Sequence, residues 1–222
     1  MDSRWRRLLE EIAEDARDTA GWTGRPRFSE RVMAALARVP RDRFVPEAYR
    51  AGAFVNAPLP IGYGQTISQP FIVALMTDLL DLEAGDRVLE IGTGCGYQTA
   101  VLAELAAEIH SIEYVPALAA TAAATLRQLG YRNIATSQGQ GREGRPEQAP
   151  FDAVMVTAAA DDVPPRLVEQ LKPGGRMVIP VAARRRSALS EQELLRLVKR
   201  ADGTIDRRVV LPVAFVPLIG KG

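Results

Sequence analysis

The chain has 222 residues, of which 47% are hydrophobic and 25% charged, the composition of a globular protein that buries a core without disulfides or metals. Its 28 basic and 27 acidic residues give a net charge of +1, so no overall field favours nucleic acid or an anionic membrane. With one cysteine, Cys95, and one histidine, His110, an intramolecular disulfide is excluded, and we expect no metal site. The lone cysteine also indicates a reducing compartment, and we expect the protein to be cytoplasmic.

The first 18 residues alternate charged side chains with apolar ones at helical spacing, namely Trp5, Leu8, Leu9, Ile12 and Ala16. This pattern predicts an amphipathic helix. Because acidic residues lie between the apolar ones, we expect the helix to pack on the protein rather than on an anionic membrane. The segment lacks the apolar core of a signal peptide, and no apolar run of the chain is long enough to span a bilayer.

Between residues 28 and 80 the sequence predicts helices joined by loops. A helical stretch over 28–39 is interrupted by the segment 40–46, which begins and ends with proline. The glycines and prolines of 58–64 predict a loop rather than a helix or a central strand. Ser68 then has the position of an N-cap for a helix over 70–80, which Pro70 opens at a permitted early position.

From residue 86 onward, short apolar runs alternate with helical patterns. Strands are predicted at 87–91, 108–113, 134–137, 151–156 and 176–181, and helices at 98–107, 116–129 and 164–171. Such alternation is typical of right-handed βαβ units and a parallel sheet covered on both faces. Two last strands, 193–200 and 207–215, flank the turn Ala201-Asp202-Gly203 and should pair as an antiparallel hairpin.

This pattern predicts an α/β fold of the Rossmann-like, class I methyltransferase type. It has a mostly parallel seven-stranded sheet, a C-terminal antiparallel hairpin and N-terminal helices. The hairpin favours the methyltransferase variant over a dehydrogenase. No linker divides the chain, so we expect one domain over 1–222. Within it, residues 1–80 form a helical cap and substrate loop, and residues 81–222 form the cofactor-binding core.

A glycine-rich segment, Gly92-Thr93-Gly94-Cys95-Gly96, follows the first predicted strand of the core and opens a helix. Glycines in this context let the backbone pass close to a ligand. A dinucleotide-binding loop would place glycine at position 97, which is Tyr97. Glu113, at the end of the next strand, has the position of a carboxylate that accepts both ribose hydroxyls. The loop therefore indicates a nucleoside cofactor without a pyrophosphate, and a nucleotide-free domain with a tight glycine turn is the alternative.

Cys95 and His110 are the two residues that could suggest a nucleophile and a base. No histidine lies near Cys95 in the sequence to activate its thiol, so we interpret Cys95 as a small spacer in the loop. His110 lies inside a predicted strand, and we interpret it as an ordinary strand residue.

Between about Phe28 and Gly220 the chain resembles the protein-L-isoaspartate O-methyltransferases. The most specific segment is Gly64-Gln65-Thr66-Ile67-Ser68-Gln69-Pro70, whereas the glycine loop and the Lys172-Pro173-Gly174-Gly175 turn occur in many methyltransferases. The other resembling segments are 39–41, 44–46, 58–63, 111–113, 149–152, 156–160 and 212–218.

The resemblance implies S-adenosyl-L-methionine as the cofactor and Ser68 as the catalytic residue. The expected cofactor-binding residues are Ile67, Gln69, Glu90, Gly92, Thr93, Gly94, Gly96, Glu113, Gln140 and Gly141. The expected substrate-binding residues are Thr66, Ser68, Ala158 and Ala159. The small residues 157–160 suit a shallow floor for an extended peptide. They also argue against DNA adenine methyltransferases, which carry an Asn/Asp-Pro-Pro-aromatic motif there.

The implied substrates are L-isoaspartyl residues of damaged proteins and peptides, whose methyl ester closes to a succinimide that hydrolyses partly to normal aspartate. A carboxyl group with a pKa near 4 is ionised at neutral pH and is already a nucleophile, so no general base is required. The protein must align the reacting atoms and exclude water, and a serine hydroxyl can orient the carboxylate without adding charge.

Three positions depart from the pattern of the resembling family. Gln140 stands where an aspartate usually holds the adenine amino group, Asn56 where an aspartate is common, and Ile219 where a threonine is usual. The amide of Gln140 can still pair with an adenine edge. Together the departures leave room for weaker activity or an altered substrate.

Two alternatives to repair methylation follow from these departures. One is carboxyl methylation of a dedicated aspartyl peptide, and the other is a non-catalytic module that binds the cofactor or a peptide. The run Arg184-Arg185-Arg186 is read as a solvated surface, with contact to acidic substrate peptides as its functional alternative. We expect a monomer that binds isoaspartyl proteins and peptides, with neither nucleic acid nor membrane as a partner.

Overall fold

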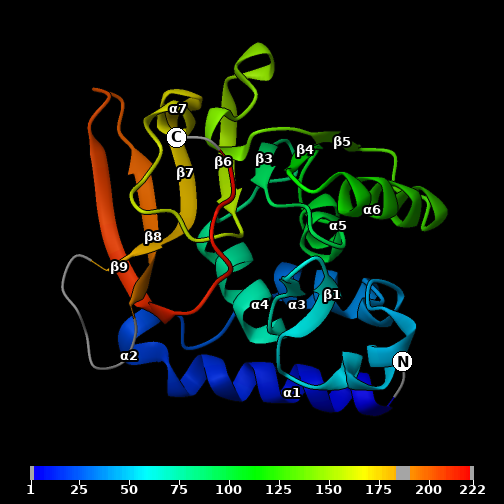
Figure 1. Cartoon of the computed structure of the whole chain (residues 1–222). Helices are drawn as coiled ribbons and strands as arrows, with labels where there is room; N and C mark the ends of the chain where they lie inside the picture. The colour runs from blue at the N-terminus through cyan, green and yellow to red at the C-terminus, as the bar shows by residue number, and fades with distance from the viewer. Residues whose placement is uncertain (1–2, 184–190, 221–222) are drawn as a thin grey trace.

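The computed structural model describes residues 3–183 and 191–220, so the arginine run at 184–186 lies outside the described residues. A central sheet has the strand order β5-β4-β3-β6-β7-β8-β9 (Figure 1). Its strands are β3 (Arg87–Ile91), β4 (Glu108–Glu113), β5 (Ile134–Gln138), β6 (Phe151–Val156), β7 (Leu171–Ala182), β8 (Gln192–Lys199) and β9 (Ile205–Val213). The first five strands pair in parallel, and β8 is antiparallel to both neighbours. The predicted Rossmann-like methyltransferase sheet is confirmed.

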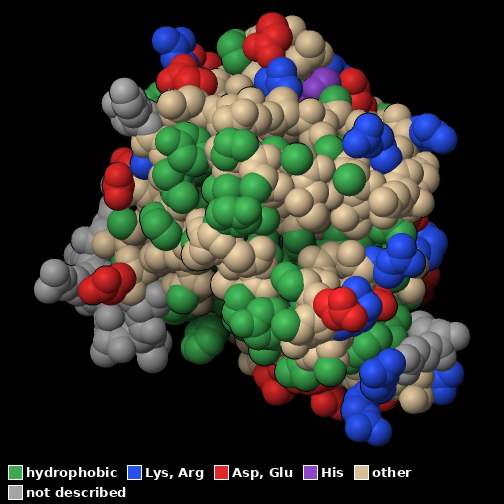
Figure 2. All heavy atoms as spheres, turned by 45° about the vertical axis from the view of Figure 1, so that its right-hand side comes forward, with side chains coloured by type: hydrophobic (Ala, Val, Ile, Leu, Met, Phe, Trp, Pro, Cys, Tyr) green, Lys and Arg blue, Asp and Glu red, His purple; other side chains and the backbone are tan. Residues whose placement is uncertain are grey.

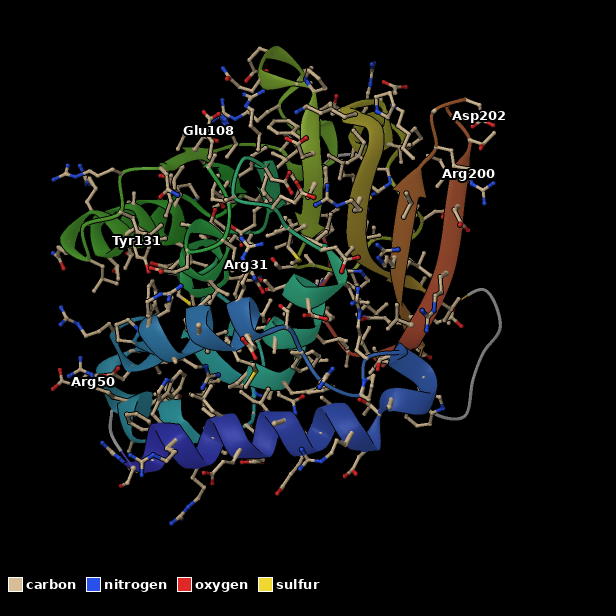
Figure 3. The ribbon with its side chains drawn as sticks, turned by 180° about the vertical axis from the view of Figure 1, so that it is seen from behind. Arg31, Arg50, Glu108, Tyr131, Arg200 and Asp202 are labelled. Atoms are coloured by element: carbon tan, nitrogen blue, oxygen red, sulfur yellow. The ribbon has the colours of Figure 1, made fainter. Side chains whose placement is uncertain are left out.

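The C-terminal hairpin is also confirmed, with β8 and β9 joined at the turn that the sequence predicts. The Arg200 amide donates to the Thr204 carbonyl at 2.8 Å, and the Gly203 amide donates to the Arg200 carbonyl at 3.0 Å. Arg200 and Asp202 mark the exposed tip of this hairpin in Figure 3. Short connections of this kind close an antiparallel pair without a crossover helix.

Helices cover the sheet and build a separate layer from the N-terminal part of the chain. They are α1 (Ser3–Asp18), α2 (Ala20–Thr23), α3 (Glu30–Arg38), α4 (Pro70–Leu79), α5 (Tyr97–Ala103), α6 (Pro116–Gln128) and α7 (Pro165–Glu169). Short 3₁₀ helices lie at Arg41–Arg43, Glu47–Phe54, Gly141–Glu143 and Pro146–Gln148. The helix α5 ends earlier than its predicted end at 107, because the amides of Ala107 and Glu108 donate to the Asp86 carbonyl instead of continuing the helix.

The N-terminal helix α1 runs beneath α3 and α4 (Figure 1). Its residues Trp5, Leu8, Ile12 and Ala16 are buried, as the amphipathic pattern predicts. No helix of the described ranges, 3–183 and 191–220, is long and apolar enough to cross a membrane. Arg31 of α3, labelled in Figure 3, donates to the carbonyls of Leu82 at 2.6 Å and Leu105 at 3.0 Å, which ties the helical layer to the loops of the core.

The hydrophobic core lies on both faces of the sheet because side chains alternate along each strand. Val88 and Ala153 belong to the cluster that includes the N-terminal helices, whereas their neighbours Leu89 and Val154 belong to the cluster on the other face. Figure 2 shows hydrophobic side chains grouped near the centre of one face, with acidic and basic ones around them. That face therefore presents both signs of charge, in keeping with the net charge of +1.

A small hairpin precedes α4 where the sequence predicts only a loop. Its strands are β1 (Leu59–Gly62) and β2 (Gln65–Ile67), which pair antiparallel outside the central sheet. Tyr63 and Gly64 at the turn have φ values of 54° and 71°, the left-handed pair that a tight hairpin turn requires. The hairpin delivers Ser68 to the start of α4.

The prediction that Ser68 caps α4 is wrong. The capping position is Gln69, whose side chain makes no capping hydrogen bond, and Pro70 brings no N–H to satisfy. The free amide of Phe71 donates instead to Oδ1 of Asn56 at 3.0 Å. Asn56 thus caps the helix from fifteen residues upstream, and Ser68 is released from this structural role.

Candidate functional site

The glycine loop lies where β3, β4 and β6 end side by side. The Gly92 amide donates to the Ile112 carbonyl at 2.8 Å, and the Thr157 amide donates to the Ile91 carbonyl at 2.9 Å. Gly92 has a φ of 96°, and a Cβ on it would lie 2.3 Å from Oγ1 of Thr157. Only glycine fits there without displacing its neighbour. The carboxyl ends of parallel strands are the usual ligand position in such folds.

Glu113 contacts the glycine loop through one carboxylate oxygen and the start of α6 through the other. Oε2 accepts the Gly94 amide at 2.7 Å, and Oε1 accepts the Val115 amide at 2.9 Å. Each oxygen of a carboxylate can accept a further hydrogen bond. Glu113 lines a cavity beside the loop, so its carboxylate can accept hydrogen bonds from a molecule bound there.

The cavity beside the loop, called the cofactor cavity below, combines these polar groups with apolar walls. It is lined by Gln65, Thr66, Ile91, Gly92, Gly94, Ile112, Glu113, Tyr114, Gly141, Thr157, Ala158, Pro217, Leu218 and Ile219. A Cβ on Gly141 would lie 2.4 Å from Cγ2 of Ile91, so only glycine lets the backbone at position 141 pass this close to the Ile91 side chain. A carboxylate for the sugar and apolar walls for a base fit a nucleoside such as that of S-adenosyl-L-methionine.

Six of the predicted cofactor residues do not line the cofactor cavity, and three of these, Glu90, Thr93 and Gly96, lie beneath the glycine loop or within it. Glu90 is fully buried and accepts hydrogen bonds at Oε2 from the hydroxyls of Thr99 and Ser111. Its burial raises the pKa of the carboxyl group to about 7. The Thr93 hydroxyl is bonded to the same Ser111 hydroxyl, and Gly96 caps the start of α5. Glu90 thus supports the loop from below through Ser111, which contacts Thr93.

Gln140 lies just before Gly141 and faces the C-terminal segment of the chain. A Cβ on Gly220 would come within 2.6 Å of Oε1 of Gln140. Gln140 is not among the residues that line the cofactor cavity, whereas Ile219, another of the three departing residues, lines it and is 38% exposed.

Ser68 lines a second cavity, larger than the cofactor cavity and called the acceptor cavity below. The acceptor cavity measures about 580 Å³ and is lined by Asp15, Thr19, Pro58, Thr66, Ser68, Gln69, Phe71, Ile72, Thr157, Leu211, Pro212, Val213, Ala214 and Phe215. Thr66 and Thr157 line both cavities. Ile67 and Ser68 also line a narrow space next to Gly92 and Gly94. Among the described residues, the Ser68 hydroxyl makes no hydrogen bond, so it is available to a bound molecule.

A buried arginine, Arg41, holds the segment that carries Ser68. Its side chain is 1% exposed and donates to the carbonyls of Ala53 at 2.9 Å, Ala57 at 2.9 Å and Ser68 at 3.1 Å. Burial lowers the pKa of the guanidinium below its ordinary value. Sequence reasoning did not assign this role, although Arg41 belongs to one of the segments that resemble the family.

The small-residue segment after β6 is divided between two roles. Ala158 lines the cofactor cavity. Ala159 instead pairs with the chain's own C-terminal segment, since its amide donates to the Val216 carbonyl at 2.8 Å and its carbonyl accepts from Leu218 at 2.7 Å. In Figure 1 this segment, drawn red, runs up beside β6. The expected floor for an extended substrate peptide is therefore occupied at Ala159 by the protein itself.

Cys95 and His110 have the structural roles that the sequence suggests. Burial raises the pKa of the Cys95 thiol to about 11, so the reactive thiolate is scarce at neutral pH. His110 is buried on β4 and packs edge-on against Phe151, with ring centroids 5.5 Å apart. Neither residue lines the acceptor cavity, and Cys95 lines the narrow space that Ser68 also lines.

The chain is similar to known proteins over nearly its whole length. A family model described as protein-L-isoaspartate(D-aspartate) O-methyltransferase matches residues 24–222. A protein-L-isoaspartate O-methyltransferase 2 of Polaromonas sp. is 52% identical over 96% of this chain and 100% of its own length. A protein-L-isoaspartate O-methyltransferase 1 of Cupriavidus necator is 53% identical over 96% of this chain and 81% of its own length.

Solved structures agree with the sequence relatives. A structure named protein-L-isoaspartate O-methyltransferase superposes with a TM-score of 0.80 and 28% identity, over 96% of this chain and 66% of that chain. A Plasmodium falciparum structure in complex with S-adenosyl-L-homocysteine, 22% identical, shares the fold with a TM-score of 0.77, over 98% of this chain and 99% of that chain. Because the family model matches residues 24–222, and the chain has the glycine loop with the Glu113 carboxylate beside it, the chain belongs to the protein-L-isoaspartate(D-aspartate) O-methyltransferase family.

Proposed function

We propose that this protein transfers a methyl group from S-adenosyl-L-methionine to the free carboxylate of L-isoaspartyl residues in damaged proteins and peptides. The observation that carries the proposal is the position of Ser68. Its hydroxyl has no partner among the described residues, and Ser68 lines both the acceptor cavity and the narrow space beside Gly92 and Gly94 of the glycine loop. Relatives that are more than 50% identical over nearly the full chain bear the corresponding name.

The cofactor's role is to supply a methyl group on a sulfonium, which is already a good electrophile. Glu113 accepts the ribose hydroxyls, and the glycine loop lets the backbone approach the ligand closely. Ile91, Ile112 and Leu218 provide the apolar surroundings of the base.

On the acceptor side, the isoaspartyl carboxylate enters ionised and attacks without a general base. The Ser68 hydroxyl donates a hydrogen bond to one carboxylate oxygen and aims the other at the methyl group. Arg41 keeps Ser68 in place through the Ser68 carbonyl, 3.1 Å from its guanidinium. The apolar residues around the acceptor cavity limit the water that reaches the reacting atoms.

The resulting methyl ester is a better acyl electrophile than the carboxylate, because methanol is a far better leaving group than the oxygen of an ionised carboxylate. The neighbouring backbone amide displaces methanol and closes a succinimide, which water opens partly to normal aspartate. The proposed biological role is thus the repair of aged proteins, with isoaspartyl proteins and peptides as partners. Its setting is the cytoplasm of a cell, with the whole chain acting as one monomeric domain.

Two peptides of identical sequence, one with isoaspartate and one with aspartate, test this function with methyl-labelled cofactor. We expect label on the isoaspartyl peptide only. Ser68→Ala should lower kcat by about 10- to 100-fold, the worth of one hydrogen bond to a charged group. Its affinity for S-adenosyl-L-homocysteine, measured by calorimetry, should stay unchanged. Equal label on both peptides, or none on either, would contradict the proposal.

A further inference from the structure

The acceptor cavity has a negative charge on its wall that the chemistry of methyl transfer does not use. Among the described residues that line this cavity, Asp15 is the one with an ionisable side chain. It belongs to α1, and the match to the family model begins only at residue 24. The other lining residues are apolar or neutral hydrogen-bonding groups.

The packing of α1 and a hydrogen bond together fix the position of the Asp15 side chain. Its neighbours Ile12 and Ala16 are fully buried, which fixes the rotation of α1. Nδ2 of Asn56 donates to Oδ2 of Asp15 at 2.7 Å, and Asn56 is fixed in turn by the Phe71 amide at 3.0 Å. The helix therefore sets this carboxylate on the wall of the cavity that Ser68 also lines.

The charge of Asp15 is not neutralised by a neighbouring base in the described part of the chain. No lysine or arginine of residues 3–183 and 191–220 forms an ion pair with it. Its hydrogen bond to the neutral amide of Asn56 leaves the negative charge in place. A substrate adds its own carboxylate to the same cavity, so a second acidic group of the substrate would meet two like charges in a partly enclosed space.

We infer that Asp15 is a specificity-determining residue, which favours isoaspartyl substrates with a lysine or arginine next to the damaged residue and disfavours those with an acidic neighbour. The inference rests on the proposed function, because the isoaspartyl carboxylate at Ser68 places the flanking residues in the remainder of the acceptor cavity. Asp15 acts on substrate binding and leaves the methyl transfer itself unchanged, so its effect falls on KM rather than on kcat.

The test uses isoaspartyl peptides that differ only in one flanking residue, which is lysine, glutamine or glutamate, placed before or after the isoaspartate. For the unchanged protein we expect kcat/KM to be about tenfold higher for lysine than for glutamate on at least one side, with the ratio falling as salt is raised. Asp15→Asn keeps an acceptor for Asn56 and should reduce the ratio to within about twofold.

Glu14→Gln is the matched control, because Glu14 is an exposed carboxylate on the same helix that pairs with Arg17 outside the cavity. This variant should keep the tenfold preference, and thermal melting should show that all variants fold. An equal kcat/KM for the lysine and glutamate peptides, or a preference that survives in Asp15→Asn, would overturn this inference and leave the proposed function standing. Absence of methyl transfer to every isoaspartyl peptide would overturn the proposed function together with it.

Discussion

Replacing Glu90 by glutamine removes an ionisable group that is fully buried beneath the glycine loop. The amide oxygen of glutamine can still accept the hydrogen bonds that Thr99 and Ser111 donate to Oε2. The amide nitrogen takes the place of Oε1, which has no hydrogen-bond partner among the described residues. The variant therefore imitates the neutral form of the acid at every pH.

The size of the expected change in stability follows from the pKa values of the Glu90 carboxyl group in the folded and unfolded states. Burial raises the pKa in the folded protein to about 7, from the ordinary value of 4.5 that applies in the unfolded chain. Between these values the folded protein binds more protons than the unfolded chain, so its stability falls as pH rises through this window. At roughly 1.4 kcal/mol per pH unit, the loss attributable to Glu90 amounts to about 3 kcal/mol.

Urea denaturation of both proteins between pH 4.5 and pH 8 measures this effect. We expect similar free energies of unfolding near pH 4.5 and an advantage of up to about 3 kcal/mol for Glu90→Gln near pH 8. Glu147→Gln, which removes an exposed carboxylate, is the control and should leave the pH dependence unchanged over this range. If the curves of Glu90→Gln and the unchanged protein run parallel, the pKa of Glu90 is the same in the folded and unfolded states, and the reasoning from burial fails.

Two further substitutions test contacts of the site, and for each one a specific result would contradict the prediction. Asn56→Asp should destabilise the protein by about 1–2 kcal/mol, since it sets a carboxylate against Asp15 at hydrogen-bond distance, and Asp15→Asn should recover most of the loss in a double-mutant cycle. An equal loss in both backgrounds would show that the two side chains do not interact. Gly92→Ala should cost at least about 2 kcal/mol in thermal unfolding and remove S-adenosyl-L-homocysteine binding in calorimetry, because its Cβ would clash with Thr157. Unaltered binding by this variant would show that the loop can shift without harm.

The core of the fold is predictable because its signals are local. The strand at 87–91, the glycines after it and the carboxylate at Glu113 follow one another within 27 residues of sequence. Each apolar run has the length of a buried strand, and each intervening pattern has the period of a helix, so β3, β4, β6 and the terminal hairpin appear where expected.

Contacts between distant segments account for most of what sequence reasoning missed. The cap of α4 comes from Asn56, and the anchor of Ser68 comes from Arg41, which lies 27 residues upstream of it. Nothing in the local pattern distinguishes a buried arginine from an exposed one, because its partners are backbone carbonyls that any sequence supplies. The resemblance marks Arg41 as part of a shared segment without indicating its task.

The departure at Asn56 shows how the structure changes the meaning of a substitution. From the sequence alone, an asparagine in place of a common aspartate removes a charge near the site. In the fold, Asn56 donates to Asp15 and accepts from Phe71, two contacts of opposite polarity that an amide makes at once and an ionised carboxylate does not. An acidic group is therefore still present on the wall of the cavity that Ser68 lines, but it is carried by α1. The effect of a substitution at position 56 therefore depends on Asp15, and the double-mutant cycle of Asn56 and Asp15 measures the interaction between the two side chains.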